Sequence, residues 1–404
     1  MQIEPTYEQT VEAVHNAASR HADIVQASAV GRSAEGRDIW LATITNPAID
    51  NQLKDVLLVT GGTHGSEETG RAATMALLDW LCSPEGRPNL DRLVVLLCPC
   101  ANPDATVRNS YTKPDGINLY QAFPFRAQPT CPEAAALYHA TSDWIPHCAV
   151  DVHGLAGGAM RESIYILPGL PAGMHRRIGY HLTELLSAEA EAAGFPQRGG
   201  FISGEFRNPR GNLASKFVSE DNSLGYTVEM TENYYPLHYA VRSGMARLKR
   251  LVTMANQRWY WHPYPGYPCD IISGHGMMMF MAHGRTPGQR RRNRRRLVWA
   301  IEHGLSRVER LSPDRNGQAR IELSTQPDTD PADLPDRYAL QLRLIPSARL
   351  QAVLLENHEL PPDEDHGWQC WQDDRSVLVR INIHRPLQPG TTTIAVRYEA
   401  PFAF

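Results

Sequence analysis

Residues 55–70 read DVLLVTGGTHGSEETG, and this stretch decides how the first part of the chain folds. Its apolar half is short and ends in two glycines, which predicts a buried strand. Residues 66–81 predict the helix that follows. Ser66 can cap this helix, and Glu67 and Glu68 lie in its first turn. A strand that turns directly into a helix is the repeating unit of α/β domains, so more such units are expected on both sides.

The same alternation extends over roughly the first 250 residues. The expected helices cover residues 7–20, 66–81, 131–145, 173–194 and 236–255. The expected strands lie within residues 23–36, 37–45, 55–62, 92–104, 148–154, 163–169 and 225–231. Strands that alternate with helices in this way predict an α/β domain with a mixed sheet flanked by helices.

The character of the chain changes near residues 261–274, WHPYPGYPCDIISG, where prolines and glycines gather. Beyond about residue 330 the helical periodicity is lost, and short segments of alternating polarity predict a small all-β sandwich. Those strands are expected at residues 339–346, 350–357, 376–384 and 391–400. We therefore divide the chain into three parts. They are a catalytic domain at 1–265, a connecting segment with a basic helix at 266–328, and a β-sandwich domain at 329–404.

Composition excludes some classes of function. The chain has 404 residues, 42% of them hydrophobic, and a net charge of −4, so it is not built as a whole to bind nucleic acid or an anionic membrane. Residues 290–296, RRRNRRR, could contact nucleic acid or an acidic partner. We prefer the interpretation that they form the solvated face of a helix or make internal ion pairs.

Cysteine usage and the N-terminus bear on the compartment. Seven cysteines are scattered along the chain, and most lie in apolar segments, which is typical of buried free thiols in a reducing compartment. Residues 1–14 are acidic and amphipathic and lack the basic start and apolar run of a secretion signal. No apolar run reaches the length of a membrane span. We therefore expect a cytoplasmic protein.

Two histidines and a carboxylate have the pattern of a metal site. His64 and Glu67 are three residues apart where the strand turns into the helix, so both side chains can converge on one ion. His153 stands at the end of another core strand, in DVHG. This ligand set, with a fourth position open, is typical of catalytic zinc.

Glu229 and Arg108 complete the expected chemistry. Glu229, at the end of a third strand, could be the general base for a metal-activated water, and Arg108 could stabilise an oxyanion. Each of these residues alone is more often structural, as a hydrogen-bonded histidine or an exposed arginine. Their common place at the C-terminal ends of strands, where open α/β sheets bind ligands, favours the functional interpretation.

Five segments, in order, resemble the zinc carboxypeptidase family of metallopeptidases. They are VGRSAEGRDIWLATIT at 30–45, GGTHGSEETG at 61–70, NPDA at 102–105, DVHG at 151–154 and YTVEM at 226–230. The resemblance covers about residues 7–255. It implies a carboxypeptidase-like fold, one Zn²⁺ per chain on His64, Glu67 and His153, and Glu229 as base and proton shuttle. It also implies Arg108 as the residue that polarises the scissile carbonyl. We count Arg108 and the neighbouring Asn109 among the expected substrate-binding residues.

Residues 116–124, GINLYQAFP, keep the glycine and the apolar positions of a family motif but lack its charged residues. Asn118 replaces an aspartate that supports the first zinc histidine, so it can accept a hydrogen bond but brings no charge. Tyr120 and Gln121 replace the asparagine and arginine that bind a free α-carboxylate. Arg161 could replace the lost cation, as could Arg207 or Arg210, although an exposed arginine is the simpler interpretation.

These observations predict a zinc-dependent amide-bond hydrolase, a carboxypeptidase-like metallopeptidase that acts on a small or modified peptide. The alternative enzyme is an N-acyl-amino-acid deacylase of the aspartoacylase or succinylglutamate desuccinylase type, which has a similar metal motif. The early segment at 30–45 and the separate C-terminal domain favour the peptidase. A binding module without turnover is a third hypothesis, which the full set of ligands and the base argue against.

Overall fold

The computed structural model describes most of the first half of the chain and the strands of the C-terminal part. The described residues are 5–49, 51, 54–124, 127–142, 144, 146–155, 163–166, 185–195, 211–221, 224–231, 236–256, 280–281, 305–306, 311–314, 318–325, 338–344, 348–363, 366–372, 377–383, 385, 388 and 390–399. The chain divides into two compact units. The first comprises Met1–Ala172 and Arg176–Gln257, and the second comprises Gly173–His175 and Arg258–Phe404.

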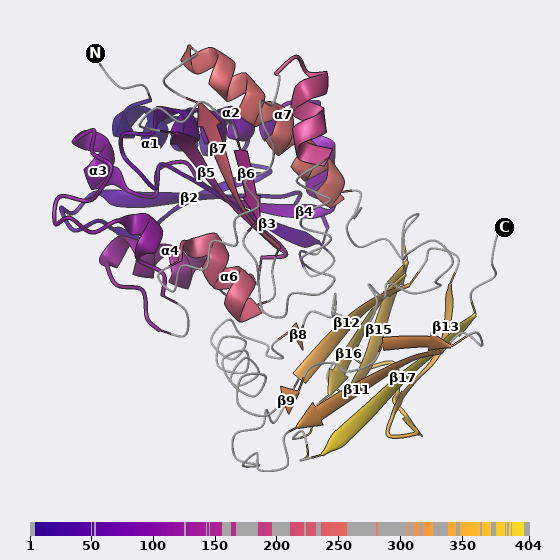
Figure 1. Cartoon of the computed structure of the whole chain (residues 1–404). Coiled ribbons are helices and arrows are strands. Elements are labelled where there is room, and N and C mark those ends of the chain that lie inside the picture. Colours follow the sequence, from indigo (N-terminus) through magenta and orange to yellow (C-terminus); the bar gives the residue numbers. More distant parts are fainter. Residues whose placement is uncertain are drawn as a thin grey trace. The chain divides into compact units, whose positions relative to one another are not determined.

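A seven-stranded mixed sheet forms the centre of the first unit, with the strand order β1-β2-β4-β3-β5-β7-β6 (Figure 1). Its strands are β1 Val25–Arg32, β2 Asp38–Ile44, β3 Asp55–Gly61, β4 Leu93–Cys98, β5 Cys148–Leu155, β6 Ser163–Ile166 and β7 Leu224–Thr231. Strands β4, β3, β5 and β7 run parallel, whereas β1, β2 and β6 join antiparallel. The α/β fold with a mixed sheet is as the sequence predicts.

Helices cover both faces of this sheet (Figure 1). On one side lie α1 Tyr7–Arg20, α2 Glu68–Cys82 and α7 Leu237–Asn256, and on the other α4 Pro132–Ser142 and α6 Leu213–Asp221. The short helix α3 Pro103–Val107 follows β4. The expected helix at 173–194 is described only from residue 185, and residues 185–192 are helical. The predicted cap of α2 was wrong, because the N-cap position is Glu67 and no side chain caps it.

The apolar core of the first unit ends where the polar residues of the candidate site begin. Every residue of β3 and β4 is buried, and apolar side chains from these strands pack with α4 and α6, among them Leu58, Leu137 and Phe217. Ala149 of β5 belongs to the same cluster. Because alternate residues of a strand share a face, Asp151 and His153 leave β5 on the side of Ala149. That face therefore changes from apolar core to polar site toward the C-terminal end of β5.

The second unit contains two antiparallel sheets, as a β-sandwich requires. Their strand orders are β10-β11-β17-β13-β14, with β9 beside β11, and β15-β16-β12-β8. The strands are β8 Phe280–Met281, β9 Leu305–Ser306, β10 Leu311–Asp314, β11 Gln318–Thr325, β12 Tyr338–Leu344, β13 Arg349–Leu355, β14 His358–Glu359, β15 Gly367–Gln372, β16 Val377–Ile383 and β17 Thr391–Glu399. The four predicted strands are present.

Strand β11 was not predicted. It comes from the expected connecting segment and pairs along its length with β17. The basic helix expected around residues 290–296 lies outside the described residues. The three-part division of the chain therefore stays a prediction.

The described cysteines are all free thiols. Five are buried, namely Cys82, Cys98, Cys100, Cys131 and Cys148, and Cys370 is exposed. Burial raises the pKa of these buried thiols, so they behave as small core residues. Among the described helices, none is both long and apolar enough to cross a bilayer.

Candidate metal centre and active site

The turn between β3 and α2 is shaped by its glycines. Gly62 has a φ of +64°, a conformation that glycine adopts without strain. A Cβ atom on Gly70 would lie 2.3 Å from the carbonyl oxygen of Val152, so only glycine lets α2 approach β5 this closely. The first turn of α2 is thereby held against the end of the strand that carries His153.

Two side chains fix the turn from outside. The buried Arg71 guanidinium donates to the carbonyl oxygen of Gly65 at 2.8 Å, and the Asn102 amide donates to that of Thr63 at 3.1 Å. Asn102 also accepts from the backbone N–H of Ala105 and so caps α3. The NPDA segment and the metal motif are therefore joined directly in space.

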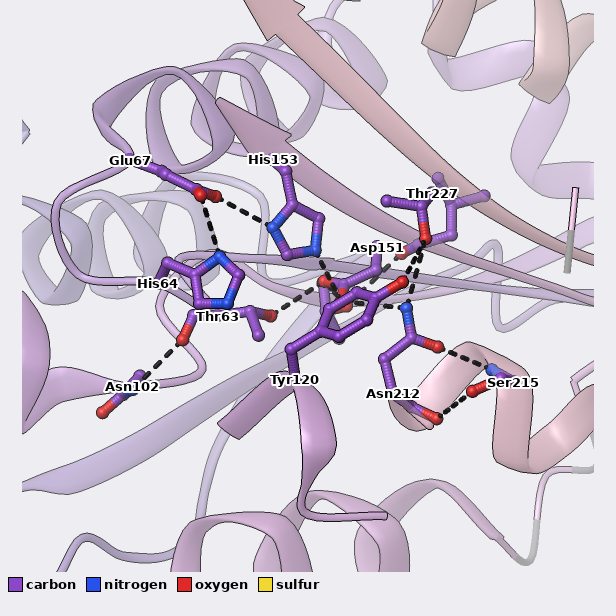
Figure 2. Close-up of polar contacts among 12 residues, drawn as sticks. Thr63, His64, Glu67, Asn102, Tyr120, Asp151, His153, Asn212, Ser215 and Thr227 are labelled. Atoms are coloured by element: carbon purple, nitrogen blue, oxygen red, sulfur yellow. Dashed lines mark hydrogen bonds and ion pairs between the residues drawn. The ribbon is translucent and has the colours of Figure 1, made fainter. Parts of the chain in front are cut away.

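The three predicted ligands converge on one point (Figure 2). Nδ1 of His64 lies 2.8 Å from Oε1 of Glu67, and Nδ1 of His153 lies 2.9 Å from Oε2 of Glu67. One ligand atom from each residue lies within 4.8 Å of the others, and all three residues are buried. Burial alone would raise the pKa of the Glu67 carboxyl, but the charges and hydrogen bonds of the two histidines lower the pKa below its usual value.

The second nitrogen of His153 faces a carboxylate. Nε2 of His153 lies 2.8 Å from Oδ2 of Asp151, and both side chains are almost completely buried. Burial alone would lower the pKa of His153, but Asp151 and Glu67 raise this pKa well above its usual value. A carboxylate on the outer nitrogen of a metal-binding histidine fixes the ring and increases its basicity.

Asp151 is itself held by neutral donors (Figure 2). The hydroxyls of Thr60 and Thr63 each donate to its Oδ1 at 2.8 Å, and the Asn212 amide donates to Oδ2 at 3.3 Å. Sequence reasoning assigned Asp151 no role, although the residue was within the quoted DVHG motif. The signal was its position two residues before a ligand on the same strand, which places both side chains on one face.

The outer nitrogen of His64 has a weaker partner. Its Nε2 lies 3.1 Å from Oδ1 of Asn118, which also accepts from the backbone N–H of Tyr120 at 2.9 Å. The predicted contact of Asn118 with the first histidine is therefore present, and it is uncharged. Tyr111 stacks on the other side of His64, with ring centroids 3.7 Å apart and planes 23° apart. Sequence reasoning did not single out Tyr111, which no local motif marks.

Tyr120 and Gln121 lie on a short 3-10 turn, Leu119–Gln121, next to the ligands. The Tyr120 ring meets the His153 ring edge-on at 5.3 Å, and its hydroxyl lies 3.4 Å from the hydroxyl of Thr227. Burial raises the pKa of Tyr120 to about 12, so the phenol keeps its proton at neutral pH. Gln121 is half-buried, and its backbone N–H donates to the carbonyl oxygen of Asn118.

Glu229 lies beside the ligands on β7. It is the direct neighbour of His153 across the parallel pair β5–β7, so the two side chains leave the same face of the sheet. The residue is half-buried. Its charge is among the causes that raise the pKa values of Tyr111 and Tyr120, after the larger effect of burial. This position suits a base at the open side of the site.

Arg108 is bound elsewhere. Its guanidinium forms an ion pair with Glu35, in the turn between β1 and β2, and its side chain is 55% exposed. Glu35 also pairs with Arg37. Asn109 is exposed, with a φ of +50°. The described contacts thus join neither residue to the ligand cluster, and Arg161, Arg207 and Arg210 lie outside the described residues.

The donor set fits zinc. Two imidazole nitrogens and a carboxylate oxygen within a few ångströms, all buried, are the ligands that catalytic zinc sites use. Each histidine also has a partner on its outer nitrogen, as is usual for zinc-binding histidines. Only three protein ligands converge among the described residues, which leaves room for a reacting group.

Part of the first unit is similar in sequence to known proteins. Residues 10–130 match the sequence model of the zinc carboxypeptidase family. Human carboxypeptidase Z is 30% identical over 106 residues, which is 24% of this chain and 16% of that protein. A zinc carboxypeptidase of Saccharothrix mutabilis subsp. capreolus is 26% identical over 104 residues, which is 24% of either chain. The matched region is thus a small part of each relative.

Solved structures extend the similarity to about three fifths of the chain. A metallo-carboxypeptidase from Burkholderia cenocepacia matches with a TM-score of 0.53 at 17% identity, over 62% of this chain and 69% of that one. Carboxypeptidase A from Helicoverpa armigera also has a TM-score of 0.53, at 14% identity, over 63% and 73%. The resemblance to zinc carboxypeptidases and the carboxypeptidase-like fold are confirmed.

Proposed function

We propose that this protein is a zinc-dependent amide-bond hydrolase that acts on a small or modified peptide. The observation that carries the proposal is the convergence of His64, Glu67 and His153, whose ligand atoms lie within 4.8 Å of one another in a buried cluster. The family resemblance over residues 10–130 and the fold of the first unit support the same function.

Bound zinc supplies a Lewis acid, which lowers the pKa of a water molecule and polarises a carbonyl. His64, Glu67 and His153 would hold it, and Asp151 and Asn118 orient the two imidazole rings from behind. Glu229, next to His153 on the neighbouring strand, takes a proton from the attacking water. It then gives this proton to the leaving nitrogen, so one carboxylate serves both halves of the reaction.

The charge around the ligands favours a particular kind of substrate. Glu67, Asp151 and Glu229 are acidic, and Tyr111, Asn118 and Tyr120 are neutral donors or acceptors. Among the described residues, no lysine or arginine forms a hydrogen bond or ion pair with the side chains of His64, Glu67 or His153, and Arg71 reaches only the backbone carbonyl of Glu67. A free α-carboxylate, which a guanidinium binds best, would lack that partner there. We therefore propose a substrate whose carboxyl group beside the scissile bond is absent, blocked or distant.

The test combines metal analysis with a substrate comparison. Purified protein is expected to hold one zinc per chain by plasma mass spectrometry and to hydrolyse peptides with amidated or modified C-termini faster than the same peptides with free carboxylates. Acetyl- and succinyl-amino acids are assayed beside them, and activity on those compounds alone would establish the deacylase instead.

Glu229→Gln provides the mechanistic control. It removes the base without removing a ligand, so turnover is expected to fall by roughly 10²–10⁴-fold while zinc content stays the same. Unchanged turnover in this variant, or a wild-type protein without stoichiometric zinc, would contradict the proposed mechanism.

A further inference from the structure

Tyr111 lies against a predicted metal ligand and is not part of the apolar core. Its ring covers one face of the buried ligand His64, and yet the residue is 47% exposed. Val107 is the other large apolar or aromatic residue among the described ones with comparable exposure. A side chain kept half in solvent and half against a metal ligand is placed for contact with a substrate.

The backbone on both sides of Tyr111 is anchored. The carbonyl oxygen of Ser110 accepts from the N–H of Ser66, in the turn between His64 and Glu67, at 3.1 Å. Two residues later, the Lys113 ammonium lies 3.0 Å from the Glu133 carboxylate, and both side chains are completely buried. Groups that are fixed before the reaction stabilise developing charge better than mobile ones, because they need no reorganisation.

The hydroxyl of Tyr111 lies near Asn118. Burial raises the pKa of this phenol, and Asn118 lowers the pKa slightly against that larger effect. Oδ1 of Asn118 already accepts from His64 and from the backbone of Tyr120. The Asn118 amide nitrogen is therefore the group left to donate to the phenol oxygen. A phenol carries its proton at neutral pH, so the half-exposed Tyr111 hydroxyl remains an O–H donor for a substrate.

Two other candidates among the described residues, Arg108 and Tyr120, are engaged elsewhere. The Arg108 guanidinium is paired with Glu35 in the β1–β2 turn. The Tyr120 hydroxyl lies against Thr227, on the interior side of the ligands. Glu229 lies close enough to Tyr111 to influence its electrostatics, so a carbonyl beside the metal ligands would have the base and the phenol as neighbours.

We infer that the Tyr111 hydroxyl donates a hydrogen bond to the scissile carbonyl oxygen and stabilises the oxyanion formed on it, in place of an arginine. The proton stays on the phenol throughout, since only a hydrogen bond is made. A neutral donor at this point also suits a substrate without a carboxylate beside the scissile bond. The inference rests on the proposed hydrolase function and adds the residue that polarises its substrate.

Tyr111→Phe tests this role, because it keeps the ring on His64 and removes only the donor. We expect kcat to fall about 100-fold with little change in KM, the usual effect of losing one oxyanion donor. Zinc content and the unfolding temperature are expected to stay at wild-type values. Tyr138→Phe, on α4, is the matched control, because its ring contacts Phe217 and Lys216 rather than the ligands.

A binding experiment separates this inference from the proposed function. The probe is a phosphinic analogue of N-acetyl-Ala-Ala-amide, in which –PO₂⁻–CH₂– replaces the scissile amide. Calorimetry with zinc-loaded protein is expected to show about tenfold weaker binding to Tyr111→Phe than to wild type, as for a lost hydrogen bond to a charged group. Equal affinities, or a loss of kcat larger in Arg108→Gln than in Tyr111→Phe, would overturn the inference. Failure of the hydrolase proposal would instead be absence of turnover in the wild type.

Discussion

His64 and His153 offer the same ring nitrogen to the same carboxylate, but their outer nitrogens have very different surroundings. Behind His153 stands Asp151, a buried carboxylate that accepts from two threonine hydroxyls. Behind His64 stands Asn118, a neutral amide on a short turn that is half-buried. The difference shows that the two halves of one metal site can be supported in unequal ways, one by the sheet and one by a loop.

The cause of this difference is the place of each partner in the fold. Asp151 lies on the same strand as its histidine, and β3 and β7 flank that strand on both sides. Asn118 is distant from His64 in the sequence, and only the folding of its loop brings it next to this histidine. The support of His153 by the sheet is therefore expected to fix the metal. The loop that supports His64 is free to differ according to the substrate that the site binds.

Asp151→Asn is expected to have the largest effect on the difference between the two histidines. It removes the charge behind His153 and leaves its shape, so zinc affinity is expected to fall about 100-fold, at the upper end of the effect of an outer partner. The measurement is competition for zinc with a fluorescent chelator.

Asp55→Asn is the matched control for this variant. Asp55 is also buried and pairs with a histidine, His147, at 3.3 Å, but it lies at the other end of β3 from the metal site. Equal loss of zinc affinity in both variants would mean that general destabilisation, rather than the contact with His153, is responsible.

Asn118→Asp gives both histidines a carboxylate beside the outer ring nitrogen. A carboxylate behind His64 is expected to raise zinc affinity by up to about tenfold. Turnover is expected to fall in the same variant, because the Tyr111 hydroxyl would donate to the new carboxylate instead of to the substrate. Zinc affinity and kcat are measured on the same preparation, and opposite changes are the expected result.

Gln121→Glu adds the same charge on the same turn without the contact to His64. If its zinc affinity rises as much as that of Asn118→Asp, the gain comes from the general field of the added charge. If only Asn118→Asp gains, the hydrogen bond to the histidine is the cause.

Thr63→Val is the smallest change. It removes one of the two hydroxyl donors to Asp151 and keeps the side-chain shape, so we expect a loss of about 1 kcal/mol in unfolding free energy. Zinc affinity should fall by less than about tenfold, below the range for a direct outer partner.

Thr141→Val, in α4, also removes a buried hydroxyl, one that bonds the carbonyl oxygen of Leu137. It should cost similar stability with no change in zinc affinity. A zinc affinity in Thr63→Val equal to that of Thr141→Val would show that the threonine supports the fold and not the metal.

Local patterns were sufficient for most of the framework of the first unit, although they did not predict α6. The apolar run of β3, the helix that follows it, and the order of the other strands in the first unit are set by residues near one another in the chain, and the structure has them within a few residues. The end of α2 that carries Glu67 was less predictable. Ser66 has the chemistry of a cap, but the N-cap position is Glu67, and Gly70 in the first turns of the helix approaches β5 closely.

Strand β11 illustrates a second limit. Its residues 318–325 come from a segment whose pattern did not separate a strand from a linker, and their pairing with β17 depends on a partner far along the chain. Such long-range pairing is a property of the assembled sheet and leaves a weak local signal.

By itself, the sequence determined which groups could hold a metal, because a histidine and a carboxylate three residues apart and a histidine at a strand end depend only on local geometry. Only the tertiary structure decided what surrounds them. It placed Asp151 behind His153, stacked Tyr111 on His64 and paired Arg108 with Glu35. The physical reason is that ligand spacing is fixed along one segment, whereas the partners of a ligand are chosen by the packing of segments that are distant in the chain.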